Sequence, residues 1–145
     1  MKDTAITIAT EGNKKIEIII KNRTYPQSTD DEDRKWLDSD VSVSILGFTA
    51  VLGIKFRIEE FINFYNQVLE MINGMLFEGL LANLEENLYI RCYLSKSGNI
   101  LWNGYVKDFE ENTLRFSLTS DFIALVFLKD QLKRIINKYS INNNH

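Results

Sequence analysis

The period of the apolar residues changes twice along this chain, and this constrains the fold more than any other feature. Before residue 59 apolar side chains recur at every second position, as in Val41-Ser42-Val43-Ser44-Ile45, which is the pattern of a half-buried strand. From Glu59 they recur three and four residues apart, which is the pattern of an amphipathic helix. The same succession returns around Leu118. The sequence therefore predicts strands followed by a helix, twice.

Two long helices are expected from the segments with helical spacing. The first covers residues 59–73 and stops at Asn73-Gly74, a pair typical of helix C-termini. It lacks a Ser, Thr, Asp or Asn cap at its start. The second covers residues 121–139 and follows Thr119 and Ser120, either of which is a suitable N-cap. The face of the second helix that we predict to be buried consists of Leu125, Leu128, Leu132, Ile135 and Tyr139.

Strand patterns precede both helices. They occupy residues 16–20, 41–45 and 48–56 before the first helix, and residues 88–94, 100–106 and 114–118 before the second. Residues 4–9 and 76–84 alternate less regularly and are weaker strand candidates. We therefore predict an α+β fold with one antiparallel β-sheet of six to eight strands, formed by two three-stranded units and covered by two long helices.

Size and composition indicate one domain. The chain has 145 residues, of which 45% are hydrophobic and 26% charged, as is ordinary for a globular protein. We assign residues 1–139 to a single domain and residues 140–145 to a disordered polar tail. The single cysteine excludes an internal disulfide. The longest apolar run, Phe122 to Leu128, is too short to cross a bilayer, and the N-terminus lacks a signal-peptide core. A cytoplasmic location without membrane contact is therefore expected.

The sequence offers no set of catalytic residues. Nucleophilic catalysis by serine or cysteine requires a nearby histidine, and the only histidine is His145, at the end of the polar tail. Cys92 shares a strand face with Leu88 and Ile90, so we expect a buried structural thiol. Glycine-rich phosphate loops and nucleotide fingerprints are absent from the sequence. We expect no enzyme activity and no cofactor, with a spatially paired set of carboxylates as the remaining catalytic alternative.

Residues 30–40 carry most of the charge of the chain. The net charge is −3, whereas this segment holds six acids against Arg34 and Lys35, so that its own charge is −4 and the rest of the chain is +1. The segment follows Tyr25-Pro26, which interrupts the preceding strand, and we expect it to form a loop. Its acids do not match a calcium-binding loop, because Trp36 takes the place of the sixth-position glycine when Asp31 is counted first. No metal site is expected.

We interpret the acidic segment as a candidate surface for binding a cationic partner. The candidate residues are Asp30, Asp31, Glu32, Asp33, Trp36, Asp38 and Asp40. Trp36 is either a core anchor or an exposed contact, and the strand that begins at Trp36-Leu37 favours the anchor. The alternative for the whole segment is a solvated loop that keeps the protein soluble. Such acidity argues against nucleic acid as the partner. The tyrosines Tyr89, Tyr93 and Tyr105 have few basic neighbours, so we expect them to pack on a half-covered sheet.

Several residues also resemble a known family. Tyr25-Pro26, Asp30-Asp31 and Trp36-Leu37 are similar to the opening of the WapI-type immunity proteins, small bacterial proteins encoded beside polymorphic toxins. The resemblance runs from about residue 14 to 139 and includes Phe48, Glu60-Phe61, Gly74, Gly104, Asp108 and Asp121. Ile58 departs from it, where a capping Thr or Asp is expected. The resemblance implies a protein that binds and neutralises a toxin, often a nuclease, and it implies no catalytic residues. A basic toxin domain is then the expected partner. The oligomeric state does not follow from the sequence.

Overall fold

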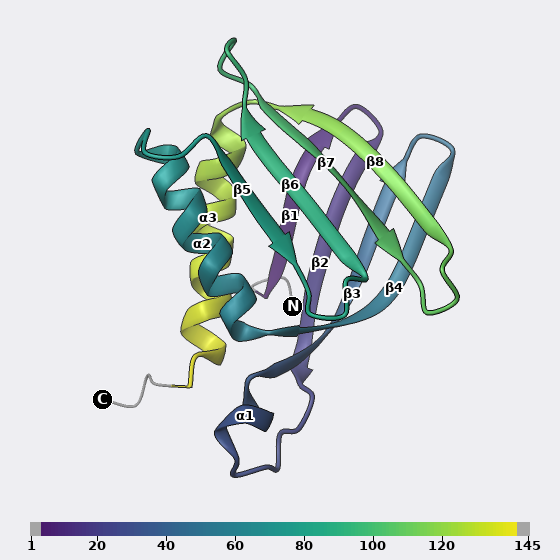
Figure 1. The fold of residues 1–145 in the computed structure, drawn as a ribbon, viewed down its shortest axis with the longest axis vertical. Coiled ribbons are helices and arrows are strands. Elements are labelled where there is room, and N and C mark those ends of the chain that lie inside the picture. The colour runs from purple at the N-terminus through teal and green to yellow at the C-terminus, as the bar shows by residue number, and fades with distance from the viewer. Residues whose placement is uncertain (1–3, 142–145) are drawn as a thin grey trace.

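The computed structural model describes residues 4–141 and contains two antiparallel sheets of four strands each, with strands in chain order within each sheet (Figure 1). The first sheet comprises β1 (Ala5–Glu11), β2 (Lys14–Arg23), β3 (Trp36–Ile45) and β4 (Phe48–Arg57), and the second comprises β5 (Glu78–Ala82), β6 (Leu88–Leu94), β7 (Ile100–Lys107) and β8 (Thr113–Ser120). The helices are α1 (Asp31–Arg34), α2 (Ile58–Ile72) and α3 (Ile123–Tyr139). A long helix therefore follows each sheet, as predicted.

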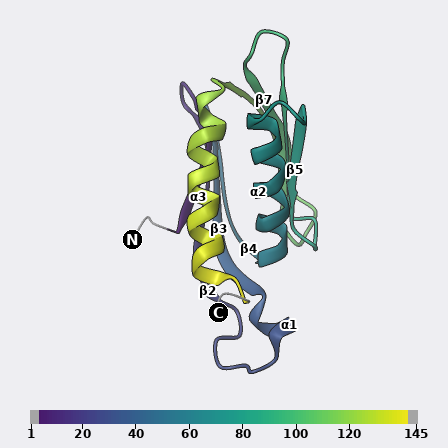
Figure 2. The same ribbon diagram turned by 90° about the vertical axis from the view of Figure 1, so that its left-hand side faces the viewer.

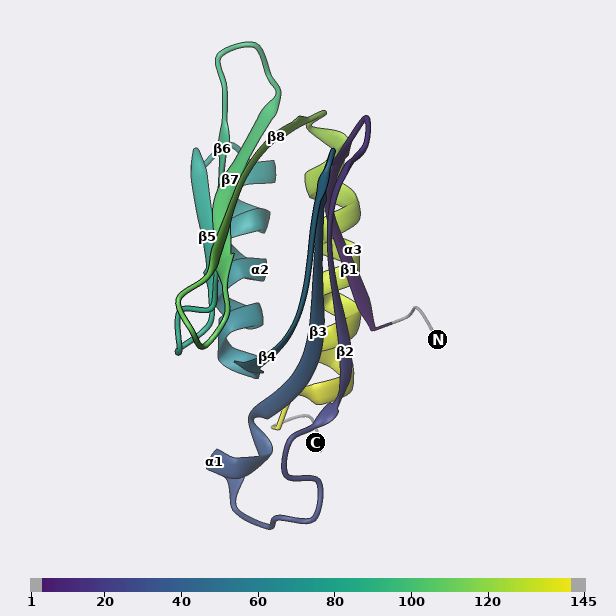
Figure 3. The ribbon, with the colours of Figure 1, turned by 90° about the vertical axis from the view of Figure 1, so that its right-hand side faces the viewer.

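The prediction of one continuous sheet is wrong, because the eight strands form two separate layers (Figure 3). Side chains such as Val41 and Val43 from the first sheet, and Ile90 and Trp102 from the second, are fully or almost fully buried in one continuous apolar cluster. Alternation in a sequence shows which side chains of a strand are buried. It does not show whether a helix or a second sheet buries them.

Each long helix covers the edge of the first strand in the sheet that it does not follow. In α3 the Gln131 Oε1 accepts a hydrogen bond from the Thr7 N–H of β1 at 3.0 Å. In α2 the Gln67 Oε1 accepts one from the Leu80 N–H of β5 at 2.7 Å. Covered edges cannot pair with further strands, so β4 and β5 stay in different sheets. The helices themselves lie side by side (Figure 2).

Each of the two units has four strands, whereas the sequence predicted three. The strand missing from each prediction is the first one. These first strands are β1 and β5, which correspond to the two weak candidates in the sequence. In β1 the neighbouring residues Ala5 and Ile6 are both buried, since α3 packs beside this strand. Burial on both sides removes the alternation by which a strand is recognised in a sequence.

The two long helices begin differently from what the sequence suggested. At the start of α2 the Glu60 carboxylate accepts hydrogen bonds from the Arg57 backbone N–H at 2.8 Å and from Arg57 Nε at 3.1 Å, and these contacts replace the missing cap. The N-cap of α3 is Phe122, so the prediction of Thr119 or Ser120 is wrong. Ser120 Oγ instead accepts a hydrogen bond from Trp102 Nε1 at 2.7 Å, because a buried indole N–H needs a partner.

Other expectations for the core are confirmed. The predicted face of α3, from Leu125 to Tyr139, is buried. Cys92 is fully buried, and its Sγ lies 3.8 Å from Met71 Sδ. Burial raises the pKa of this thiol to about 12.

In the predicted polar tail, the Ser140 N–H donates to the Ile136 carbonyl, and residues 142–145 lie outside the described part. Among residues 4–141 no helix is long and apolar enough to cross a membrane.

Gly104 generates a prediction about stability. It lies opposite Ile90 in the β6–β7 ladder, where a Cβ atom would overlap the Tyr89 carbonyl oxygen and come within 2.8 Å of the carbonyl carbon. Backbone atoms cannot move aside as a side chain does. We expect Gly104→Ala to lower the free energy of unfolding by more than the roughly 1–3 kcal/mol typical of an overpacked core, as measured by urea denaturation.

Gly53→Ala is the matched control, because the nearest atom to its Cβ would be the Ser39 carbonyl oxygen at an ordinary 4.0 Å. That variant should differ from the parent by about half a kcal/mol or less. Equal stabilities for the two variants would contradict the role of Gly104.

Candidate partner-binding surface

The acidic segment begins with a short helix and is not the loop that the sequence suggested. Asp30 caps α1, since its Oδ1 accepts a hydrogen bond from the Glu32 N–H at 2.8 Å. Asp33 Oδ2 accepts one from Ser28 Oγ at 3.0 Å, which ties the preceding turn to the helix. Asp30, Asp31 and Glu32 are exposed, and Asp33 is half-buried. Figure 1 shows α1 projecting from one end of the two layers.

The second half of the segment belongs to β3, and its acids already have partners. Asp38 Oδ1 accepts hydrogen bonds from Lys55 Nζ at 2.9 Å and from Thr24 Oγ1 at 2.8 Å. Partial burial opposes the ionised form of Asp38, but these hydrogen bonds outweigh it and hold the pKa of the carboxyl below its ordinary value. Asp40 Oδ1 lies 3.4 Å from Lys21 Nζ. The structure thus separates the candidate acids into a group on α1 and two paired residues on the sheet.

Trp36 is not the anchor that the sequence favoured. Alternation along β3 places Leu37 in the core with no exposed surface and leaves Trp36 half-buried on the opposite face. The Arg57 guanidinium lies 6.0 Å from the centroid of the Trp36 ring, within the range of a cation–π contact. Leu37 is therefore the residue that fixes this end of the strand, and part of the indole of Trp36 is exposed to solvent.

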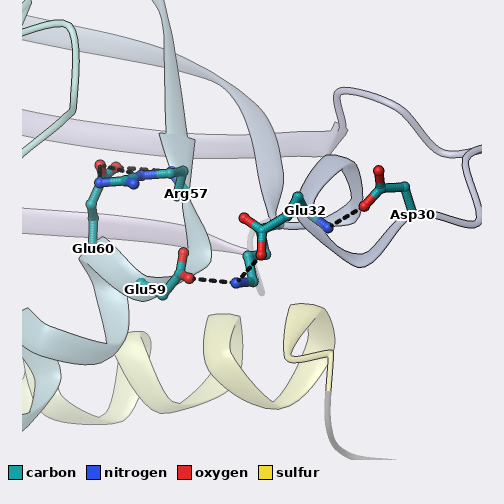
Figure 4. Close-up of polar contacts among 6 residues, drawn as sticks. Asp30, Glu32, Arg57, Glu59 and Glu60 are labelled. Carbon is teal, nitrogen blue, oxygen red and sulfur yellow. Dashed lines mark hydrogen bonds and ion pairs between the residues drawn. The ribbon is translucent and has the colours of Figure 1, made fainter.

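Four carboxylates that the sequence analysis did not select belong to elements at the same end of the molecule as α1 (Figure 1). Glu59 and Glu60 are in the first turn of α2, and Glu85 and Glu86 are in the turn between β5 and β6. Lys35 joins α1 to α2, because its Nζ lies 2.9 Å from both Glu32 Oε2 and Glu59 Oε2. Figure 4 shows two of these carboxylates, Glu59 and Glu60, in a row that begins with Asp30 and Glu32.

These residues define a surface that we call the acidic end. It consists of residues 30–35, 57–60 and 83–87, with eight carboxylates and three cations, Arg34, Lys35 and Arg57. Its formal charge is −5, and the rest of the chain is therefore +2, given the net charge of −3. In Figure 1 α1, the start of α2 and the β5–β6 turn lie at the same end of the molecule.

Two buried asparagines hold the β5–β6 turn in place. Asn83 Oδ1 accepts a hydrogen bond from the Leu88 N–H at 2.9 Å, and Asn83 Nδ2 donates to the Lys55 carbonyl of β4 at 3.3 Å. Asn87 Nδ2 donates to the Lys107 carbonyl of β7 at 2.9 Å. Because buried amides must be hydrogen-bonded, these contacts fix the turn to both sheets. The exposed Glu85 and Glu86 are therefore presented from a rigid support.

The carboxylates of the acidic end do not form a metal centre. Within residues 4–141 no three His, Cys, Asp or Glu side chains come close enough to hold a metal ion. At the centre of the row in Figure 4 an ammonium group occupies the space between Glu32 and Glu59. Hydrogen bonds to Glu59 and then to Glu32 raise the pKa of Lys35 to about 12. The surface offers negative charge for recognition by a partner.

The fold itself places the chain among α+β proteins with two four-stranded sheets, each followed by a helix. The crystal structures of MRP1/MRP2 from Trypanosoma brucei are similar to it, with a TM-score of 0.51 over 92% of this chain and 83% of that chain. The sequence identity is 6%, so this similarity concerns the fold alone. No curated protein matches the sequence.

The family of this protein follows from a match between its sequence and a family model. The model of the immunity protein WapI-like family matches residues 7–140, and the chain belongs to that family. This confirms the resemblance noted in the sequence. Two residues on which the resemblance rests have structural explanations. At Gly104 a side chain cannot fit. Asp108 Oδ1 accepts hydrogen bonds from the N–H groups of Glu110 and Asn112 in the β7–β8 turn.

The Lys35 contacts predict a pH-dependent contribution to stability. Burial alone would raise the pKa of Glu59, but hydrogen bonding and attraction from Lys35 outweigh it and hold that pKa below the ordinary value of 4.5. A depressed folded-state pKa gives stability that is present above pH 4.5 and is lost as the pH falls through the folded-state pKa. Lys35→Met should therefore lower the melting temperature at pH 7, and the difference from the parent should shrink by pH 3.

Lys96→Met removes an exposed charge from the β6–β7 turn and serves as the control. Its melting temperature relative to the parent should not depend on pH in the same window. A constant difference between Lys35→Met and the parent from pH 7 to pH 3 would show that the link between α1 and α2 is not electrostatic.

Proposed function

We propose that this immunity protein binds a cognate toxin domain without catalysis, and that the acidic end is the surface that contacts the toxin. Family membership supports an immunity role. The single observation that carries the choice of surface is the charge distribution, with −5 in three short segments and +2 elsewhere. We infer further that the toxin domain is basic and acts as a nuclease.

The chemistry of a nuclease supports this choice of surface. Nucleases bind phosphates with Lys and Arg side chains, so the substrate-binding face of such a toxin carries positive charge. Carboxylates at Asp30, Asp31 and Glu86 are complementary to that face. Complementary charge speeds the encounter of two proteins and disfavours wrong partners. Binding there would block the substrate without any reaction, by occupying the same surface.

A second candidate function is a soluble interaction domain whose acidic end only keeps the protein in solution. The observation that favours it is internal pairing, since Asp30 caps α1 and Lys35 lies between Glu32 and Glu59. Paired carboxylates still produce a negative potential when they outnumber the cations beside them. An experiment on association kinetics separates the two candidates.

We expect the triple variant Asp30→Asn, Asp31→Asn, Asp33→Asn to keep its fold, because asparagine also caps helices. It should associate about ten-fold or more slowly with the toxin domain encoded in the neighbouring gene, used in a catalytically inactive form, and its rate should depend less on salt. Surface plasmon resonance at two salt concentrations measures both quantities. Protection of cells that express the active toxin should weaken in parallel.

The control is the triple variant Glu70→Gln, Asp121→Asn, Asp130→Asn, which removes three exposed charges from α2, from the residue before Phe122 and from α3. Its association rate should stay close to that of the parent. If both triple variants bind and protect as well as the parent, the acidic end is a solubility feature and the toxin contacts another surface.

A further inference from the structure

An open hollow of about 440 Å³ adjoins the acidic end on the outer face of the second sheet. We call it the tyrosine hollow. Its apolar and aromatic lining comes from Leu80, Leu84, Tyr89 and Tyr105, and its charged lining comes from Arg57, Glu60 and Glu86. Leu80 and Leu84 are 38% and 56% exposed. The hollow therefore combines exposed apolar surface with a charged rim.

The aromatic part of the hollow is held in a fixed geometry. Tyr89 and Tyr105 are directly opposite one another on β6 and β7, and their rings stack with centroids 5.5 Å apart and planes 4° from parallel. Arg115, the next residue across on β8, has its guanidinium 5.7 Å from the centroid of Tyr105. Rings ordered in this way lose little conformational freedom when a partner covers them.

Such a surface has the composition of a binding hot spot. Hot spots are rich in tyrosine and arginine, lie in pockets, and are surrounded by polar residues that exclude water. In the hollow the tyrosines and Leu80 provide the apolar contact area, and Glu60 and Arg57 provide the polar rim. The Arg57–Glu60 ion pair, with 3.1 Å between Nη2 and Oε2, holds both rim groups in position.

We infer that the tyrosine hollow is the anchoring part of the toxin interface, and that it binds an apolar side chain of the toxin next to a basic residue. This inference rests on the proposed function. Glu60 and Glu86 belong to both the hollow and the acidic end, and Arg57 lies between the hollow and Trp36. The two surfaces are therefore continuous, and a partner drawn to one also meets the other.

Charge distinguishes the toxin from other possible occupants. A nucleic acid would bring phosphates against the carboxylate of the exposed Glu86, which repels them. A second copy of this chain, bound by a two-fold axis through the hollow, would place two surfaces of formal charge −5 next to each other. A basic protein is complementary to the same surroundings.

The acidic end and the hollow then contribute to different rate constants. Exposed charges act at a distance and mainly change the rate of association, whereas buried apolar contacts mainly change the rate of dissociation. Leu80→Ala and Tyr89→Ala should each raise the dissociation rate from the inactive toxin domain by roughly ten-fold or more. Their association rates and the salt dependence of those rates should remain as in the parent.

Phe127→Ala is the matched control, because Phe127 lies on α3 and is 62% exposed. It should dissociate at the parent rate. If Tyr89→Ala lowers the melting temperature, Leu84→Ala supplies the same test from the more exposed β5–β6 turn. If the parent binds and neither Leu80→Ala nor Leu84→Ala changes the dissociation rate, the inference about the hollow is overturned while the proposed function stands. If the parent does not bind the toxin domain, both are overturned.

Two further measurements test the other occupants. A fluorescein-labelled single-stranded oligonucleotide should show no change in anisotropy with the parent protein. In analytical ultracentrifugation the parent and the Tyr89→Ala variant should have the same sedimentation coefficient. Oligonucleotide binding that Tyr89→Ala abolishes, or a dimer that the same variant dissociates, would assign the hollow to a nucleic acid or to a second copy and overturn the inference.

Discussion

The exchange of helices between the two sheets determines the rest of this structure. Gln67 of α2 accepts a hydrogen bond from the edge of β5, and Gln131 of α3 accepts one from the edge of β1. Since covered edges cannot pair further, the chain forms two facing sheets. The same arrangement places the first turn of α2 beside the β5–β6 turn, so that Glu60 and Glu86 line one hollow. The acidic end is therefore a consequence of how the edges are covered.

Much of the secondary structure was predictable because its periodicity is local. The buried face of α3 and the alternation in β3 are properties of neighbouring residues, and both are confirmed. The number of sheets was not predictable, since a buried strand face has the same sequence whether a helix or a sheet covers it. The strand pattern of β1 was weak in the sequence for a related reason. Ala5 and Ile6 are both buried, so burial does not alternate at the start of β1.

The candidate surface was predictable only where its residues are consecutive. Asp30 to Asp33 form a visible acidic run and lie together on α1 and its cap. Glu59 and Glu86 reach the same surface through tertiary packing, which no window of sequence contains, although acids in the first turn of a helix are a weak local signal. The expectation for Trp36 was wrong because it rested on the start of the strand alone. Side chains alternate between the two faces of β3, and Leu37 lies on the buried face whereas Trp36 does not.

The central claim is that the toxin binds across the acidic end and the tyrosine hollow together. Hydrogen–deuterium exchange of the protein, alone and with the inactive toxin domain, tests this most directly. The account predicts that the toxin slows exchange in α1, at the start of α2 and in residues 80–89. Protection confined to the β3–β4 turn, where Leu46 and Phe48 are 68% and 66% exposed, with those segments unchanged, would contradict it.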